Sequence, residues 1–180
     1  MTAAELLSVA AFLEGKHAQA FPSFGSERMG APVMAFCRIE TKPIRLREPV
    51  IQPDALIVQD PTLLHQVEVF DGLADTGYLL LNSARGFEDL GLAEFVGRFP
   101  AGHCRTVPAS ELALRHVGRP LPNAALLGGF AGITDALKIE SVLAAIRAKF
   151  SGAIGDSNAA AAQEAYETVR RRPVVETSHV

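Results

Sequence analysis

The polar side chains best placed for binding chemistry gather in one short segment, residues 22–32, with the sequence PSFGSERMGAP. Ser23, Ser26, Glu27 and Arg28 lie in this segment, which has a proline at each end and glycines at positions 25 and 30. Proline fixes φ, and glycine adopts backbone conformations that other residues rarely reach. This placement of prolines and glycines therefore predicts a loop of one defined shape with its side chains exposed.

The residue types in this loop favour binding of an anion. An arginine guanidinium pairs bidentately with a phosphate or a carboxylate, and serine hydroxyls and backbone amides can complete such a site. Arg28, with Ser23 and Ser26 near it, therefore indicates contact with a phosphate or with a carboxylate at an interface. The alternative is a rigid structural turn in which Arg28 only caps the chain locally with Glu27.

Other kinds of active site find little support in the sequence. Ser83 follows an apolar segment, but no GxSxG motif surrounds it, and neither GxGxxG nor GxxxxGK[ST] occurs. Cys37 and Cys104 stand far apart, without a CxxC pair or a neighbouring group of histidines. We expect both to be core thiols in a reducing compartment, and we expect no metal site.

Composition indicates an ordinary globular protein. The chain has 180 residues, of which 48% are hydrophobic and 21% charged, and a formal net charge of -3. Such a chain predicts one domain, residues 1–172, followed by a C-terminal tail, residues 173–180. The slight acidic excess gives no reason to expect a nucleic-acid partner. Because we find neither a long apolar stretch nor a signal peptide, we expect a cytoplasmic protein without a membrane segment.

Strand and helix patterns alternate along the chain. Residues 2–15 have the pattern of an amphipathic helix, and the nearly continuous apolar run 33–39 predicts a strand buried on both faces. The residues that follow it, 40–53, are polar and proline-rich, as in a hairpin or an edge excursion. Further strands are predicted at 54–60, 77–83 and 104–108, and helices at 61–65, within 87–99, and at 109–117, 123–134, 140–150 and 157–172.

This alternation predicts an α/β fold, specifically a three-layer α/β/α sandwich with a mostly parallel or mixed, Rossmann-like sheet. The strand at 77–83 ends in the small polar residues Asn82 and Ser83. Ligands of open α/β sheets bind at the carboxyl ends of the strands, so this edge is a second place to look for a site. In the helix at 123–134, the glycines at 128, 129 and 132 predict close packing on a neighbouring element.

Several of these segments together resemble a known family. The loop FPSFGSERMGAPV, the preceding TAAELL helix and the later segment PNAALLGGF resemble the gamma subunit, or fused gamma domain, of the thiamine-diphosphate-dependent 2-oxoacid:ferredoxin oxidoreductases. The likeness covers most of residues 2–170. The form of the loop at residues 24–28 is similar to that of the branch acting on pyruvate, 2-oxoisovalerate and aromatic 2-oxoacids.

The resemblance implies a multisubunit enzyme. Such an enzyme decarboxylates a 2-oxoacid on thiamine diphosphate with Mg, passes electrons through iron-sulphur clusters to ferredoxin or another acceptor, and transfers the acyl group to coenzyme A. Alpha-, beta- and ferredoxin-like delta-type subunits are the implied partners and hold these cofactors. The gamma chain is expected to bind none of them alone and to supply no catalytic or metal-binding residue.

The resemblance also implies a role for the loop. The gamma chain covers the active site and takes part in coenzyme A access, and the residues implied to bind at this site are Ser23, Gly25, Ser26, Glu27, Arg28 and Asn123. The alternative function is a free-standing nucleotide- or acyl-binding α/β module without redox activity.

Two departures from the family pattern accompany this likeness. Relatives often have two consecutive arginines where this chain has Arg28 and Met29. They also have a strand and a GxGGQG loop before the first helix, and a valine where Met1 stands. We therefore expect the native polypeptide to extend upstream by about a dozen residues or somewhat more, with a GTG valine codon read as a start codon. The alternative is a true truncation.

Overall fold

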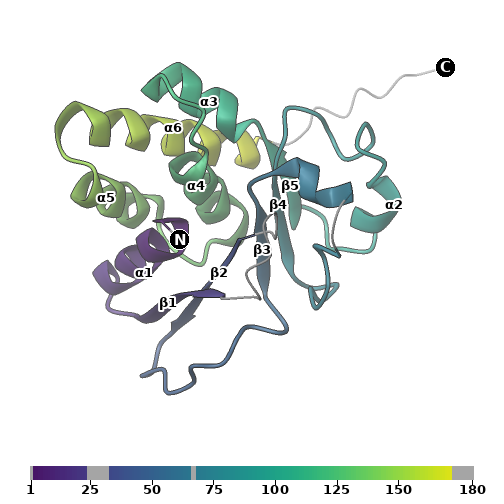
Figure 1. Ribbon diagram of the computed structural model, residues 1–180, viewed down its shortest axis with the longest axis horizontal. Helices are drawn as coiled ribbons and strands as arrows, with labels where there is room; N and C mark the ends of the chain where they lie inside the picture. The colour runs from purple at the N-terminus through teal and green to yellow at the C-terminus, as the bar shows by residue number, and fades with distance from the viewer. Residues whose placement is uncertain (1, 24–32, 66–67, 172–180) are drawn as a thin grey trace.

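The computed structural model describes residues 2–23, 33–65 and 68–171, and it contains two small sheets (Figure 1). Three parallel strands have the order β3 (Ala55–Val58), β4 (Tyr78–Asn82), β5 (Cys104–Val107). The other two, β1 (His17–Ser23) and β2 (Met34–Glu40), form an antiparallel ribbon. The larger sheet is therefore wholly parallel and the smaller one antiparallel, and the predicted parallel strands are confirmed.

The helices lie in two unequal layers. The larger layer consists of five helices on one side of the sheets: α1 (Thr2–Leu13), α3 (Ala109–Val117), α4 (Asn123–Thr134), α5 (Ile139–Lys149) and α6 (Gly152–Arg170). The other side of the parallel sheet carries only short elements, the 3₁₀ helix η1 (Pro61–His65) and α2 (Ala93–Val96). This arrangement confirms the α/β fold and shows that one outer layer is thin.

Side chains of the central strand β4 pack against the helices on both faces of the parallel sheet. Leu80 packs into the core formed with the five-helix layer, whereas Leu79 and Leu81 pack with Val58 into a second core beneath η1 and α2. All three leucines are completely buried. Successive side chains of a strand point to opposite faces, so the unbroken run of leucines reflects burial on both faces.

Glycines allow α4 to pack closely against its neighbours, as predicted. A Cβ atom added at Gly128 would lie 1.9 Å from the carbonyl oxygen of Ala162 in α6, and one at Gly132 would lie 2.5 Å from a methyl carbon of Val169. At Gly129 an added Cβ would lie 3.0 Å from a methyl carbon of Leu80 in β4. Glycine lowers the helix propensity at these positions, but its lack of a side chain permits contact with α6 on one side and with the sheet on the other.

The prediction that residues 33–39 form a strand buried on both faces is wrong in its burial. The strand exists as β2, but Met34 is 52% exposed and the central residues of the strand are only half-buried. Cys37 and Ile39 pack on the helical core, while Phe36 lies on the opposite face, 5.4 Å from Phe21 of β1 between ring centroids. This outward aromatic pair makes the sequence look continuously apolar, although only one face meets the core.

The helix predicted at 157–172 begins earlier, at Gly152, and ends at Arg170. Glycines at 152 and 155 lower the helix propensity of the segment GAIGD. An added Cβ at Gly155 would lie 1.8 Å from the carbonyl oxygen of Phe150, so the tight turn from α5 into α6 requires glycine there. Within the described residues, none of the helices has the length and apolar character required to span a bilayer.

Candidate functional site

The structure describes two of the six predicted site residues. Ser23 is the last residue of β1, half-buried and opposite Met34 of β2. Asn123 is the first residue of α4 and is half-buried. The other four, Gly25, Ser26, Glu27 and Arg28, lie outside the described residues.

Ser23 ends β1 and Asn123 begins α4, and the opposite ends of these two elements lie close to each other. There, Lys16 Nζ donates to the carbonyl of Ala136 at 2.7 Å, and the backbone amide of Lys138 donates to Glu14 Oε1 at 2.6 Å. These bonds tie the turn between α1 and β1 to the segment that follows α4. β1 leads away from this turn to Ser23, and α4 leads back from it to Asn123; no hydrogen bond joins the two residues in the described part of the chain.

The start of α4 has no side-chain cap, a feature that it shares with α2, α3, α5 and α6. The residue before Asn123 is Pro122, which offers no side-chain cap to the first amides of the helix. The positive end of the helix dipole and the free amides of a first turn favour a negatively charged group. Asn123 adds a side-chain amide at the same place.

A hollow of about 300 Å³ lies at the carboxyl edge of the parallel sheet. This is the edge at which the sequence indicated a second site. Its lining comes from the ends of β4 and β5, the start of α3 and nearby loops: Pro61, Asn82, Ser83, Ala84, Arg85, Leu90, Pro108, Ser110 and Glu111.

Asn82 holds this edge together. Its side chain is buried, and Nδ2 donates to the carbonyl of Gln59 and to Ser110 Oγ, each at 2.8 Å. Its Oδ1 accepts the backbone amide of Ser110 at 3.2 Å. The amide thus joins the ends of β3 and β4 to the first turn of α3, and every polar atom of the side chain is used.

The serines around this hollow hydrogen-bond to neighbouring groups, and within the described residues neither is paired with a base as a nucleophile would be. Ser83 Oγ accepts the backbone amide of Arg85 at 3.0 Å, and Ser110 Oγ is engaged by Asn82. Among residues 2–23, 33–65 and 68–171, no hydrogen bond joins either serine to a histidine. The sequence did not predict the Asn82–Ser110 contact; its only signal was a polar residue ending the apolar run YLLLN.

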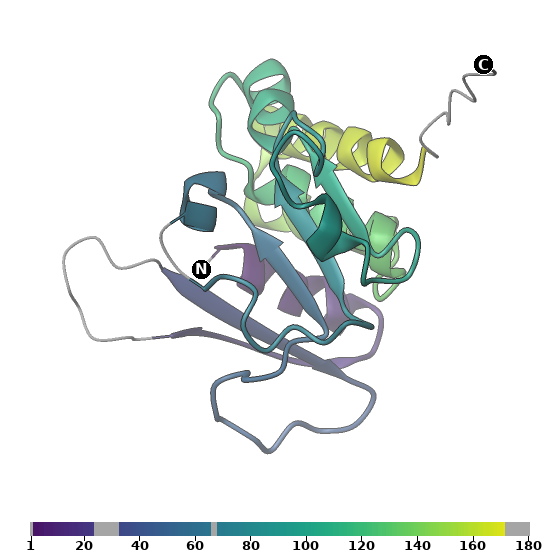
Figure 2. The ribbon, with the colours of Figure 1, turned by 90° about the vertical axis from the view of Figure 1, so that its right-hand side faces the viewer.

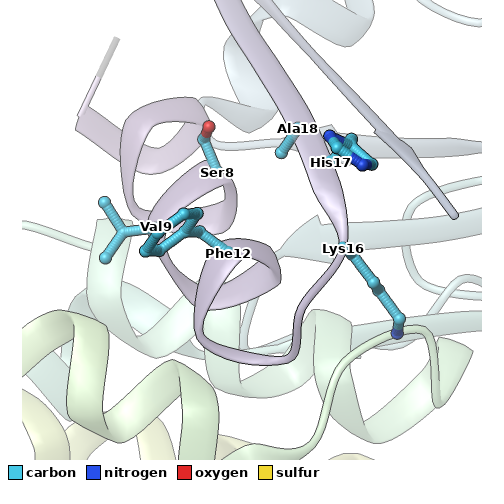
Figure 3. A pocket seen from close by; sticks show the side chains of 6 residues that line it. All are labelled: Ser8, Val9, Phe12, Lys16, His17 and Ala18. Carbon is cyan, nitrogen blue, oxygen red and sulfur yellow. The ribbon is translucent and has the colours of Figure 1, made fainter. Parts of the chain in front are cut away.

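A second hollow, of about 360 Å³, lies between α1 and the beginning of β1 (Figure 3). Its lining is Ser8, Val9, Phe12, Lys16, His17 and Ala18. Figure 3 shows the Lys16 side chain extending away from the others, in line with its bonds to Glu14 and Ala136. No hydrogen bond links Ser8 to His17 in the part of the chain described, and the surface is mainly apolar.

The two cysteines are free thiols, and burial raises the pKa of each, Cys37 and Cys104, to about 11. A thiol with such a pKa is almost entirely protonated near neutral pH and reacts slowly. Both residues are half-buried. Within the described ranges, no three histidine, cysteine or acidic side chains gather as metal ligands would.

Comparison with known proteins identifies the family. The model of the pyruvate ferredoxin/flavodoxin oxidoreductase family matches residues 1–168. The chain is 47% identical to the pyruvate/ketoisovalerate oxidoreductases common subunit gamma of Pyrococcus furiosus, over 93% of this chain and 89% of the relative. It is 45% identical to the pyruvate synthase subunit PorC of Methanothermobacter marburgensis, over 94% and 90% of the two chains.

A solved structure shows the same relationship. The crystal structure of pyruvate oxidoreductase subunit PORC from Thermotoga maritima is similar with a TM-score of 0.74 and 32% sequence identity, over 92% of this chain and 87% of the other. The resemblance drawn from the loop and helix motifs is thereby confirmed, including its assignment to gamma-type subunits. The chain belongs to the pyruvate ferredoxin/flavodoxin oxidoreductase family.

Proposed function

We propose that this chain is the gamma subunit of a multisubunit enzyme that oxidatively decarboxylates a 2-oxoacid to an acyl-coenzyme A. The observation that carries the proposal is the family match over residues 1–168, together with relatives of gamma type that are nearly half identical over almost their whole length. Residues 1–172 would act as one gamma-type domain, with 173–180 as a tail. The alternative, a free-standing nucleotide- or acyl-binding module, is not favoured by these relatives.

The proposed partners carry the cofactors. Alpha- and beta-type subunits would hold thiamine diphosphate and Mg, and a ferredoxin-like delta-type subunit would hold iron-sulphur clusters that deliver electrons to ferredoxin or another acceptor. The assembled enzyme would work in the cytoplasm. This chain would cover the active site and control substrate access. It would supply neither an electron-transfer cofactor nor a nucleophile.

Within the enzyme, we propose that the chain contributes to the active-site cover and to coenzyme A access. Ser23, Gly25, Ser26, Glu27 and Arg28 would form one part of this contribution, and Asn123 another. Asn123 is the first residue of α4, and the amides and dipole at a helix N-terminus would suit the phosphates of coenzyme A.

The names of the relatives support pyruvate as the first substrate to test. The Pyrococcus protein is named as a common subunit of pyruvate and ketoisovalerate oxidoreductases. We therefore propose that the choice among 2-oxoacids is made by the partner subunits of this enzyme and not by this chain.

Purification of the tagged chain from its native cell tests the function. The proposal predicts that larger subunits, thiamine diphosphate and iron accompany the chain. A chain that purifies alone, with a bound nucleotide or acyl compound, would instead support the free-standing module.

Arg28→Ala in the assembled enzyme tests the loop. Loss of a bidentate phosphate contact is expected to raise the KM for coenzyme A about tenfold, because a charge-assisted hydrogen bond contributes about 1.5–3 kcal/mol. Steady-state assays with coenzyme A and pyruvate as varied substrates provide the measurement. An unchanged KM for coenzyme A, in an enzyme that assembles normally, would assign Arg28 to a local structural turn.

A further inference from the structure

The segment that follows β2 concentrates positive charge and exposed apolar side chains. Residues 41–51, which we call the basic loop, contain Lys42, Arg45 and Arg47 against one acidic residue, Glu48, while the chain as a whole has a net charge of -3. Leu46 is 60% exposed and Ile51 80% exposed. Figures 1 and 2 show this segment at the lower end of the molecule, away from the five-helix layer.

The backbone of the basic loop is fixed to the rest of the protein at two points. Arg38 Nη1 donates to the carbonyl of Glu48 at 2.6 Å, and Nη2 donates to that of Pro49 at 3.4 Å. The carbonyl oxygen of Ile51 lies so close to Gly72 that a Cβ atom there would be 2.0 Å away. Gly72 also has a φ of 82°, so glycine is required on two grounds. The loop is thus held by its backbone while its side chains remain on the surface.

The charges of the basic loop are not neutralised by the described part of the chain. The ion pairs there involve Lys16, Arg115, His116, Arg147 and Arg170, and none of them reaches Lys42, Arg45 or Arg47. An anchored loop that combines unpaired cations with exposed Leu46 and Ile51 is typical of a surface that another molecule covers.

The mixture of side chains indicates the class of partner. A nucleic-acid backbone offers phosphates for the cations but no apolar surface for Leu46 and Ile51, and the net negative charge of this chain opposes a polyanion. A protein surface with acidic side chains around an apolar centre satisfies both features.

We propose that the basic loop docks on an acidic surface with an apolar centre, carried by another subunit of the same oxidoreductase. Arg45 and Arg47 would pair with carboxylates of that subunit, and Leu46 would lie between them in an apolar contact. This inference rests on the proposed function, because it takes the chain to be one subunit of a larger enzyme.

Co-expression of the full-length chain with the other subunits of the enzyme tests this inference. The variant Arg45→Glu/Arg47→Glu reverses two charges of the loop. Arg119→Glu/Arg171→Glu is the matched control, because it makes the same change in net charge at two exposed arginines elsewhere. Leu46→Asn, with Leu121→Asn as its control at a 55% exposed leucine, tests the apolar contact separately.

The loop charge reversal is expected to reduce copurification of the other subunits by roughly tenfold or more at low salt, while its control assembles as the wild type does. Leu46→Asn is expected to weaken assembly at every salt concentration. Added salt should weaken the wild-type complex more than the charge-reversed one. Thermal unfolding of each purified chain shows whether the variant is folded.

Normal assembly of a folded Arg45→Glu/Arg47→Glu variant would overturn the inference and leave the proposed function intact. Equal losses in the loop variant and its control would also overturn it, because net charge alone would then explain the effect. A variant that keeps its subunits but loses binding to a DNA fragment would assign the loop to nucleic acid instead. Failure of the wild-type chain to copurify with any subunit would contradict the proposed function itself.

Discussion

Asn82 is the buried residue on which the carboxyl edge of the parallel sheet depends most. Its side chain bonds to the carbonyl of Gln59 and to both the hydroxyl and the amide of Ser110. In Asn82→Ala these partly buried groups lose their partner. We expect a loss of about 1–3 kcal/mol in the free energy of unfolding, measured by urea denaturation of the full chain.

Ser83→Ala is the matched control for this variant. Ser83 is the next residue along the chain and accepts only the backbone amide of the exposed Arg85. Its loss is expected to change stability by no more than about 0.5 kcal/mol. Equal effects of the two substitutions would show that Asn82 is not the link between the strands and α3.

Glu164 gives the fold a pH-dependent contact between α3 and α6. His116 Nε2 and Arg115 Nη1 each lie 2.6 Å from a carboxylate oxygen of Glu164. The hydrogen bond with His116 is the main cause that lowers the pKa of the Glu164 carboxyl below its usual value of 4.5, and Arg115 adds to it.

A carboxyl whose pKa is lower in the folded state binds more protons when the chain unfolds. Its contribution to stability is therefore present above the unfolded pKa and is lost as the pH falls through the folded value. Glu164→Gln is expected to flatten the rise of unfolding free energy between about pH 3 and 6. Urea denaturation across this range provides the measurement.

Glu94→Gln removes a carboxylate of α2 that forms no ion pair within the described residues, and serves as the control. If it flattens the pH profile as much as Glu164→Gln does, the contact with His116 and Arg115 is not responsible.

Among the elements, the contact of α4 with α6 depends most clearly on a single residue. Gly128→Ala would raise helix propensity by about 1 kcal/mol, but the new methyl group would meet the backbone of Ala162, 1.9 Å from its carbonyl oxygen. Two packed backbones would have to separate. We therefore expect a net loss of about 1–3 kcal/mol in the free energy of unfolding.

Gly86→Ala provides the comparison, because an added Cβ at Gly86 meets nothing within 4 Å. Urea denaturation is expected to show a change of no more than about 0.5 kcal/mol for that variant. A Gly128→Ala protein as stable as the wild type would mean that α4 and α6 can move apart freely.

Helices with strong local signals were predictable from sequence almost to the residue. α3 and α4 have the predicted bounds. η1 also begins at the predicted Pro61, where Asp60 Oδ1 accepts the amide of Thr62 at 2.9 Å. The start of α6 was missed because the glycines at 152 and 155 have low helix propensity, although the tight turn at Phe150 requires glycine at 155. The burial of β2 was misjudged because an apolar sequence does not reveal which face of a ribbon the core covers.

The candidate sites were predictable only in part. The polar end of β4 indicated a sheet edge at which a hollow lies, and Asn82 and Ser83 both line this hollow. The partner of Asn82 is Ser110, 28 residues further along the chain, and no local pattern connects them. The roles of Ser23 and Asn123 stay predictions, and those of residues 25–28 lie outside the described part of the chain.

At the scale of the whole molecule, exposed apolar side chains occur on both sides of a continuous core. The ribbon β1–β2 and the basic loop expose Met34, Leu46 and Ile51, and the five-helix layer exposes Phe12 and Ile154. Such exposure fits a chain that meets other subunits. The account therefore depends on the chain working within an assembly.

Reconstitution of the enzyme with and without this chain is the most direct test of that claim. The proposed alpha-, beta- and delta-type subunits are purified together, and the reduction of an electron acceptor is measured with pyruvate and coenzyme A. The account predicts that coenzyme A-dependent turnover is low without this chain and rises with added chain until the subunits are equimolar. Full turnover without the chain, or no increase when it is added, would contradict the account.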